Sequence, residues 1–288
     1  MPPAERPGRA PATGPGGTVI DTARVEISRA RGALLVVEHY WTWYRRNWRA
    51  TAVSSVLQPL LFLLAFGVGF GALVEGGGQA AQATGGVPYL VWLAPALLAV
   101  SAVQAAAFES TYPVLSAFKW QKIYHAMAAT PLTPGQIAIG HLSWTVIKMT
   151  GTGAIYLAVI AVFGGVGGPG VVLSLLAASL TGAAMAAPVM AFSATVTNEG
   201  SAFTMLFRFV VIPMTLFSGT FFPVDRLPAI VMPLVWISPL WHGTELARAA
   251  ALDRWAPAAA LGHLAYLLAL LGVGIVLVTR LFRRRLGQ

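Results

Sequence analysis

Two strongly apolar stretches of the sequence carry a basic side chain, and each base lies near hydroxyl groups that could bind a polar ligand. Lys148 shares one helical stripe, at spacings of three, four and four residues, with Thr145, Thr152 and Tyr156. Arg208 follows Thr204 by four residues in the second stretch. An ionisable group at the centre of a bilayer costs about 2.5–3.5 kcal/mol on insertion scales, so it needs a partner or a function. Two interpretations stay open: a snorkelling or structural role, paired with Glu109 or Glu199, or a polar cavity for transport.

Motifs for catalysis are absent from the sequence. It contains no G-x-x-x-x-G-K-[ST] phosphate-binding loop and no H-E-x-x-H zinc motif, and Ser218 does not lie in a G-x-S-x-G turn. The five histidines are scattered and there are no cysteines, which leaves no metal-ligand spacing and no thiol nucleophile. We therefore expect no catalytic residue, no metal and no cofactor in this chain, and a membrane-embedded enzyme is disfavoured.

The composition is that of a protein that meets lipid. Apolar residues make up 57% of the 288 residues, 30 more are glycine, and only 10% are charged. Soluble domains average about 25% charged residues, so a soluble or a disordered chain is excluded. The apolar runs are continuous rather than alternating, which argues against a membrane β-barrel. The sequence predicts an all-α polytopic membrane protein, and the net charge of +9 is not interpreted as nucleic-acid binding.

Six stretches have the length and apolarity of a spanning helix, which needs about 20 residues. They cover roughly 52–74, 88–108, 142–163, 171–193, 201–218 and 258–279. The apolar stretch 228–241 is short and contains three prolines, so we expect short re-entrant helices after the fifth span. Residues 1–18 are rich in proline and glycine and are expected to form a disordered tail, with 19–288 as one transmembrane domain.

The basic residues lie mostly on one side of the predicted spans. Eight arginines precede the first span, Lys119 and Lys122 lie between the second and third, and four arginines follow the last. Loops rich in Lys and Arg stay in the cytoplasm. We therefore expect both termini in the cytoplasm, which agrees with an even number of spans, and a location in the cell membrane.

Two further segments read as amphipathic helices. Residues 20–49 place one apolar face at the level of the lipid headgroups, formed by Leu34, Val37, Trp41, Tyr44 and Trp48. This segment could be a membrane anchor alone, or an interface helix that also contacts a cytoplasmic partner. The loop 109–141 contains a short helix, ended by Thr130-Pro131 and Pro134-Gly135. It needs a surface to dock on, either lipid or a groove on another subunit.

Three segments together resemble a known family. They are AMAATPLTPGQIAIGHL at 126–142, the Pro-rich region 216–252 that closes with Arg248, and 108–127 continuing into Trp144–Lys148. In this order, with six spans, the chain resembles the membrane subunits of type-2 ABC transporter permeases. It looks closest to the branch that includes the nodulation-factor (lipochitooligosaccharide) export permease.

The resemblance implies a permease homodimer or heterodimer that works with two copies of a separate ATPase subunit, which binds ATP and Mg. It implies export of an amphipathic substrate such as a drug, a lipid or a lipid-linked saccharide, and hence a possible link to drug resistance. It also implies that the helix 117–129 is the coupling helix that docks on the ATPase. We expect its docking residues to be Phe118, Trp120, Ile123, Tyr124 and Met127, with Lys122 nearer the rim.

The competing class is a secondary transporter or channel that needs no ATPase. Such proteins are commonly built from internal repeats. We find no convincing repeat between 52–163 and 171–279.

Overall fold

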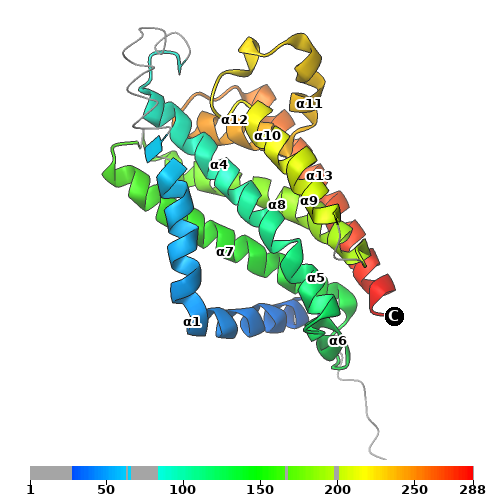
Figure 1. Ribbon diagram of the computed structural model, residues 1–288. Coiled ribbons are helices and arrows are strands. Elements are labelled where there is room, and N and C mark those ends of the chain that lie inside the picture. The colour runs from blue at the N-terminus through cyan, green and yellow to red at the C-terminus, as the bar shows by residue number, and fades with distance from the viewer. Residues whose placement is uncertain (1–27, 63, 66–83, 166–167, 198–200, 288) are drawn as a thin grey trace, which may run out of the picture.

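The chain forms a bundle of long helices that run between two ends (Figure 1). The computed structural model describes residues 28–287 except 63, 66–83, 166–167 and 198–200, and within these ranges it contains helices and no strand. One end carries α6 (Ile123–Ala128) and the last turns of α13 (Pro257–Arg285), and the opposite end carries α11 (Met232–Ile237) (Figure 1). The predicted tail 1–18 lies outside the described residues.

Four helices are long and apolar enough to cross a membrane. They are Tyr89–Lys119, in which α4 (Tyr89–Glu109) continues into α5 (Tyr112–Lys119), then α7 (Pro134–Val162), α8 (Val171–Thr195) and α13. These four coincide with the second, third, fourth and sixth predicted spans and confirm a long apolar helix at each. The fifth is a shorter apolar helix, Ala202–Phe217. The first, 52–74, ends among residues outside the described part of the chain, so six spans remain a prediction.

The fifth helix is not uniform. It consists of α9 (Ala202–Leu206), a π-helical turn η2 (Phe207–Val211) and α10 (Ile212–Phe217). A π turn adds a residue to the helical circumference and often marks a functional position. Arg208 lies in this turn.

α4 and α8 form the centre of the bundle, where most of their residues are buried. Their facing sides are rich in alanine, which lets the backbones approach closely. A Cβ on Gly182 of α8 would lie 3.1 Å from the Ala102 carbonyl oxygen of α4. A Cβ on Gly274 of α13 would lie 2.7 Å from the Ala187 Cβ of α8. Small residues therefore set the separation of the central helices.

α1 (Arg29–Phe62) is one continuous helix of 34 residues. Its first part lies across the end of the bundle that carries α6, and its second part turns to run beside α7 (Figure 1). The predicted interface helix 20–49 and the start of the predicted first span are thus a single element. Residues 20–27 of that prediction lie outside the described residues.

α7 begins at Pro134, eight residues before the predicted start of the third span at 142. Thr133 caps it, because its hydroxyl accepts from the Gln136 backbone N–H (3.3 Å) and the Gln136 side chain accepts from the Thr133 N–H (2.8 Å). Proline suits the first helical position, where no N–H partner is needed. Pro134 therefore starts a helix here, as well as following the end of the preceding one.

The stretch 228–241 forms a 3-10 turn (Ala229–Val231), α11 and the start of α12 (Pro239–Ala251). The buried Arg248 holds α12 to the bundle. Its guanidinium donates to the Thr220 carbonyl (2.9 Å) and the Trp92 carbonyl (3.3 Å), and it lies 3.5 Å from the centre of the Trp92 ring. Short helices are present as predicted, and their entry into the membrane remains a prediction.

The contact between α1 and α7 depends on a glycine. A Cβ on Gly140 would lie 2.5 Å from the Val36 Cβ and 2.7 Å from the Ala33 carbonyl oxygen, both on α1. We predict that Gly140→Ala lowers stability by about 1–3 kcal/mol, because neither neighbour can move without displacing α1. Gly151→Ala is the matched control on the same helix, since nothing lies within 4 Å of its Cβ position. It should be neutral or slightly stabilising.

Thermal unfolding of the two purified variants in the same detergent measures this difference. Equal midpoints for Gly140→Ala and Gly151→Ala would show that the close contact of α1 with α7 is not a constraint.

Candidate functional site

The loop between the second and third predicted spans is mostly helical, but it is not the single helix 117–129 that the sequence predicts. α5 ends at Lys119 and α6 begins at Ile123. Lys122 has a left-handed backbone with φ of 54°. Residues other than glycine seldom take this conformation, which turns the chain sharply. The loop is therefore two helices joined by a corner at 120–122.

The orientation of the loop's aromatic residues corrects a second expectation. Phe118 and Tyr124, expected to dock on a partner, are buried inside this chain at 3% and 0% exposure. Their rings pack on each other (4.6 Å between centroids) and on Phe282 of α13 (4.8 and 5.2 Å). Both are thus part of the chain's own core, where they hold the loop against the bundle.

The corner of the loop is what faces outward. Trp120 is 50% exposed, and Lys122 is exposed beside it. Ile123 and Met127 are half-buried against the core. Of the predicted docking residues, the structure therefore leaves Trp120 and Lys122 fully at the surface. Their contact with a partner remains a prediction.

A buried polar cluster lies directly behind this corner. The Tyr124 hydroxyl of α6 lies 2.7 Å from Nδ1 of His141 on α7, and the Tyr40 hydroxyl of α1 lies 2.8 Å from the same nitrogen. The two tyrosine hydroxyls also interact with each other, so their two protons are shared among three oxygen and nitrogen atoms, and the imidazole hydrogen-bonds the backbone of Glu109 at the end of α4. We call Tyr40, Tyr124 and His141 the Tyr–His cluster. It joins α1, α4, α6 and α7.

No local pattern in the sequence connects these three residues, which are separated by up to 101 positions. One signal was present: Gly32, Val36 and Tyr40 recur every four residues, and they form the side of α1 that packs on α7. The apolar face predicted for this segment is a different one, and it lies at the surface. Leu34, Trp41 and Trp48 are exposed, and Val37 and Tyr44 are half-buried.

Arg285 closes the same end of the bundle from α13. Its guanidinium donates to the carbonyls of Ser193 (3.0 Å) and Ala194 (2.9 Å) at the end of α8, and it lies 4.2 Å from the centre of the Phe118 ring. Carbonyls in the last turn of a helix have no partner within the helix, so a cation satisfies them. The C-terminal arginines thus have a structural role as well as a topological one.

The predicted polar stripe of α7 faces the bundle. Nζ of Lys148 lies 2.6 Å from Oε1 of Glu109, which is one of the two pairings left open by the sequence. Thr152 donates to the Lys148 carbonyl (3.1 Å). Thr145 and Tyr156 are buried, and their hydroxyls have no hydrogen-bond partner among the described residues. The stripe therefore combines an ion pair with two buried hydroxyls that remain available.

Arg208 and Thr204 do not join this stripe. α9–α10 and α7 lie on opposite sides of α4 (Figure 1). Both side chains are exposed, and around Arg208 the exposed neighbours are apolar: Met205, Phe209 and Ile212. No ion pair or hydrogen bond connects Arg208 to another described residue. A single chain thus does not assemble the predicted six-residue cavity.

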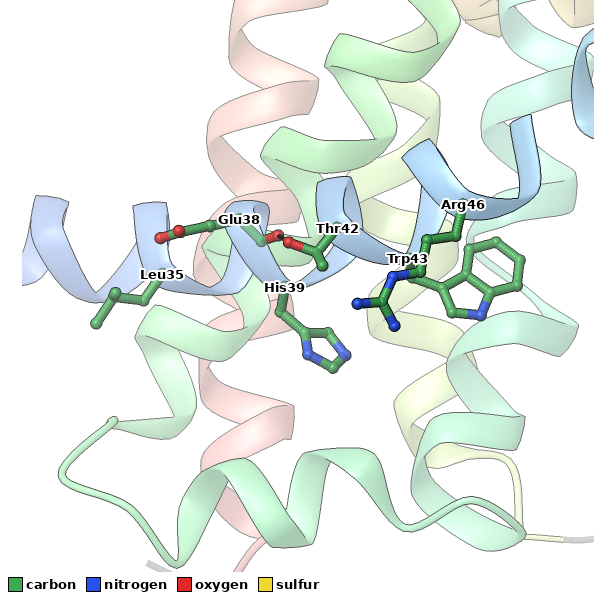
Figure 2. Close-up of a pocket in the computed structure, with 6 residues that line it drawn as sticks. All are labelled: Leu35, Glu38, His39, Thr42, Trp43 and Arg46. Atoms are coloured by element: carbon green, nitrogen blue, oxygen red, sulfur yellow. Dashed lines mark hydrogen bonds between the residues drawn. The ribbon is translucent and has the colours of Figure 1, made fainter. Parts of the chain in front are cut away.

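A shallow pocket lies on the exposed side of α1 (Figure 2). It is lined by Leu35, Glu38, His39, Thr42, Trp43 and Arg46. His39, Trp43 and Arg46 project from one side of the helix (Figure 2), and Trp43 is 60% exposed. This pocket and the corner at Trp120 are two exposed surfaces near the same end of the molecule.

The histidines are less scattered in space than in sequence. Besides His141, His242 of α12 and His263 of α13 meet with 2.8 Å between their Nδ1 atoms, and His242 Nε2 lies 2.9 Å from the Trp236 carbonyl oxygen. Burial lowers the pKa of His242, which favours its neutral form. The described residues contain no group of three metal-ligating side chains. The histidine pair therefore links two helices.

Removing one partner of the Lys148–Glu109 pair should destabilise the fold more than removing both, because it leaves a single unpaired charge. The two side chains are 17% and 22% exposed, so a lone charge would be poorly solvated. We predict that Glu109→Gln or Lys148→Met alone lowers stability by about 3 kcal/mol, and that the double variant recovers most of the loss. Thermal unfolding of the four proteins tests this. Losses that simply add in the double variant would contradict it.

Comparisons with known proteins agree with this architecture. Residues 33–252 match the family described as ABC-2 type transporter. The chain is 32% identical over 235 residues to nodulation protein J of Sinorhizobium fredii, covering 78% of this chain and 86% of the relative. It is 30% identical to nodulation protein J of Rhizobium leguminosarum bv. viciae over 84% of this chain and 93% of the relative, and to that of Rhizobium meliloti over 85% and 94%.

The family match covers most of the chain, and four of the described helices are long and apolar enough to cross a membrane. The chain therefore belongs to the ABC-2 type transporter family, as a multi-pass membrane protein and the transport subunit of its system.

Proposed function

We propose that the chain is the permease subunit of an ATP-driven exporter in the cell membrane, and that two permeases act with two copies of a separate ABC ATPase, which binds ATP and Mg. One observation carries the proposal: the α5–α6 corner is fixed rigidly to its own bundle and presents Trp120 and Lys122 outward. A helix that transmits force from a partner needs both properties, a firm internal attachment and an exposed contact.

The charge distribution supports a cytoplasmic position for this corner. Arg31, Arg45 and Arg46 of α1, Lys122, and Arg283–Arg285 of α13 belong to elements that lie at one end of the bundle (Figure 1). The positive-inside tendency supports a cytoplasmic location for that end and for both termini. An ATPase in the cytoplasm could then contact the corner and the pocket on α1.

We also propose that the substrate is amphipathic, such as a drug, a lipid or a lipid-linked saccharide. The support is a membrane-embedded polar stripe beside wide apolar surfaces. Thr145 and Tyr156 carry buried hydroxyls without partners, and the Lys148–Glu109 pair lies on the same side of α7. Buried polar groups of this kind are usually matched by a ligand, water or another subunit.

The exposed face of α9–α10 is proposed to meet the second permease. Arg208 lies there among exposed apolar side chains, and a charged group facing lipid would be costly. A second copy of the chain, or a water-filled space between two copies, would remove that cost. Thr204 and Arg208 would then line the dimer cavity.

The docking proposal predicts a local effect of one tryptophan. Trp120→Ala should weaken binding of the proposed partner ABC ATPase by about 30-fold, because truncating an aromatic hot spot costs about 2 kcal/mol or more. Trp255→Ala is the matched control: Trp255 is 47% exposed and lies just before the first turn of α13, the helix whose last turns lie at the α6 end. Lys122→Ala should change binding less, since exposed charges contribute about 0–1 kcal/mol.

The measurement is co-purification of the ATPase at equal permease expression, followed by ATP hydrolysis of the complex. Equal retention by the Trp120→Ala and Trp255→Ala variants would exclude the corner as the docking site. ATP-independent transport by the purified permease in liposomes would instead favour a secondary transporter or channel.

The dimer proposal can be tested cleanly because the chain has no native cysteine. Phe209 is 70% exposed beside Arg208, and Leu268 on α13 is 50% exposed. We predict that Phe209→Cys forms an intermolecular disulfide on mild oxidation in membranes, whereas Leu268→Cys remains a monomer on gels. Cross-linking of the Leu268→Cys variant alone would place the contact on α13 instead.

A further inference from the structure

The Tyr–His cluster combines three features that a purely space-filling contact would not need. Tyr124 and His141 are buried and Tyr40 is half-buried, all three side chains are polar, and each comes from a different helix. Burial raises the pKa of Tyr124 well above its usual value, so its hydroxyl keeps its proton and remains a donor. A neutral imidazole has one acceptor and one donor nitrogen, and the contacts of His141 to the tyrosines and to the Glu109 backbone use both kinds.

The polar contacts continue beyond the cluster into the bundle. The His141 imidazole hydrogen-bonds the backbone of Glu109. The Glu109 carboxylate in turn pairs with Lys148, which follows His141 on α7 by seven residues. Tyr124 is only four residues from Trp120, at the other side of the α5–α6 corner. A series of polar contacts therefore runs from Tyr124, beside the exposed corner, through His141 and Glu109 to the polar stripe of α7, with a branch through Tyr40 to α1.

We propose that Tyr40, Tyr124 and His141 are positioning residues for coupled transport: their hydrogen bonds make α1, α6 and α7 move together when a partner moves the α5–α6 corner. This inference rests on the proposed function. Aromatic packing alone would hold α6 in place but would let the Tyr124 ring slide over its neighbours. A directed hydrogen bond fixes the relative position of the two helices that it joins.

Removing single hydroxyls tests the proposal, because Tyr40→Phe and Tyr124→Phe keep the aromatic rings and their packing. Tyr112→Phe is the matched control on α5, since the Tyr112 ring packs on Phe203 and its hydroxyl has no hydrogen bond to a described residue. A single cysteine replaces Ile155, which is 46% exposed on α7, and carries an environment-sensitive fluorophore. The signal is the fluorescence change of the permease–ATPase complex on trapping with ATP and vanadate.

We expect Tyr40→Phe and Tyr124→Phe to bind the ATPase as well as the parent protein but to give a smaller fluorescence change, because losing one net hydrogen bond lowers the equilibrium constant for the coupled movement about fivefold. Tyr112→Phe should respond like the parent. A full response from both cluster variants would overturn the proposal. So would reduced thermal stability with an unchanged response, because that result describes a structural role only.

A second measurement does not need the ATPase. In a double-mutant cycle on the purified permease, Tyr40→Phe and Tyr124→Phe should lower the thermal midpoint non-additively, because the two hydroxyls share one nitrogen. Additive shifts would show that the hydroxyls are independent and would overturn the proposal. If the parent protein binds no ATPase but the cycle is non-additive, the proposed function fails and the cluster stands as a shared network.

Discussion

The close approach of helix backbones is the constraint on which the rest of this structure depends. Lipid is as apolar as leucine, so apolar helices gain little by leaving it, and they associate through tight packing and polar contacts. Here the seams consist of glycine and alanine: Gly140 against α1, Gly182 against α4 and Gly274 against α8. Because the backbones are close at these seams, the polar groups between the helices can reach one another. The Tyr–His cluster lies where the seam between α1 and α7 meets the end of α4.

The sequence predicted the long helices well because their signal is local. A run of about 20 apolar residues predicts a helix regardless of its neighbours. α4 and α8 therefore appear within two residues of the predicted limits. The start of α7 was placed eight residues late, because hydropathy does not register the Thr133–Gln136 cap or Pro134 at the first helical position. The π turn at Phe207–Val211 has no sequence signature that we could have used.

The side chains of the site were harder to predict, because their partners are distant in the sequence. The aromatic pattern of 118–127 shows correctly that one face is buried, but a pattern cannot say whether the burying surface belongs to a partner or to the same chain. Phe282, 164 positions after Phe118, decides that question. Lys148 was recognised as a residue that needs a partner, and the structure selects Glu109. Arg208 was recognised on the same grounds, and no described residue of its own chain pairs with it.

The contrast between these two bases indicates where the molecule can change shape. Lys148 belongs to a region in which small-residue seams and polar contacts join α1, α4, α6 and α7, so those helices can shift only together. Arg208 lies on α9–η2–α10, which is short and contains a π turn, and many of its side chains are exposed. A transporter must open one surface while another remains intact. The joined helices are suited to carry movement, and the face around Arg208 is suited to be the surface that opens.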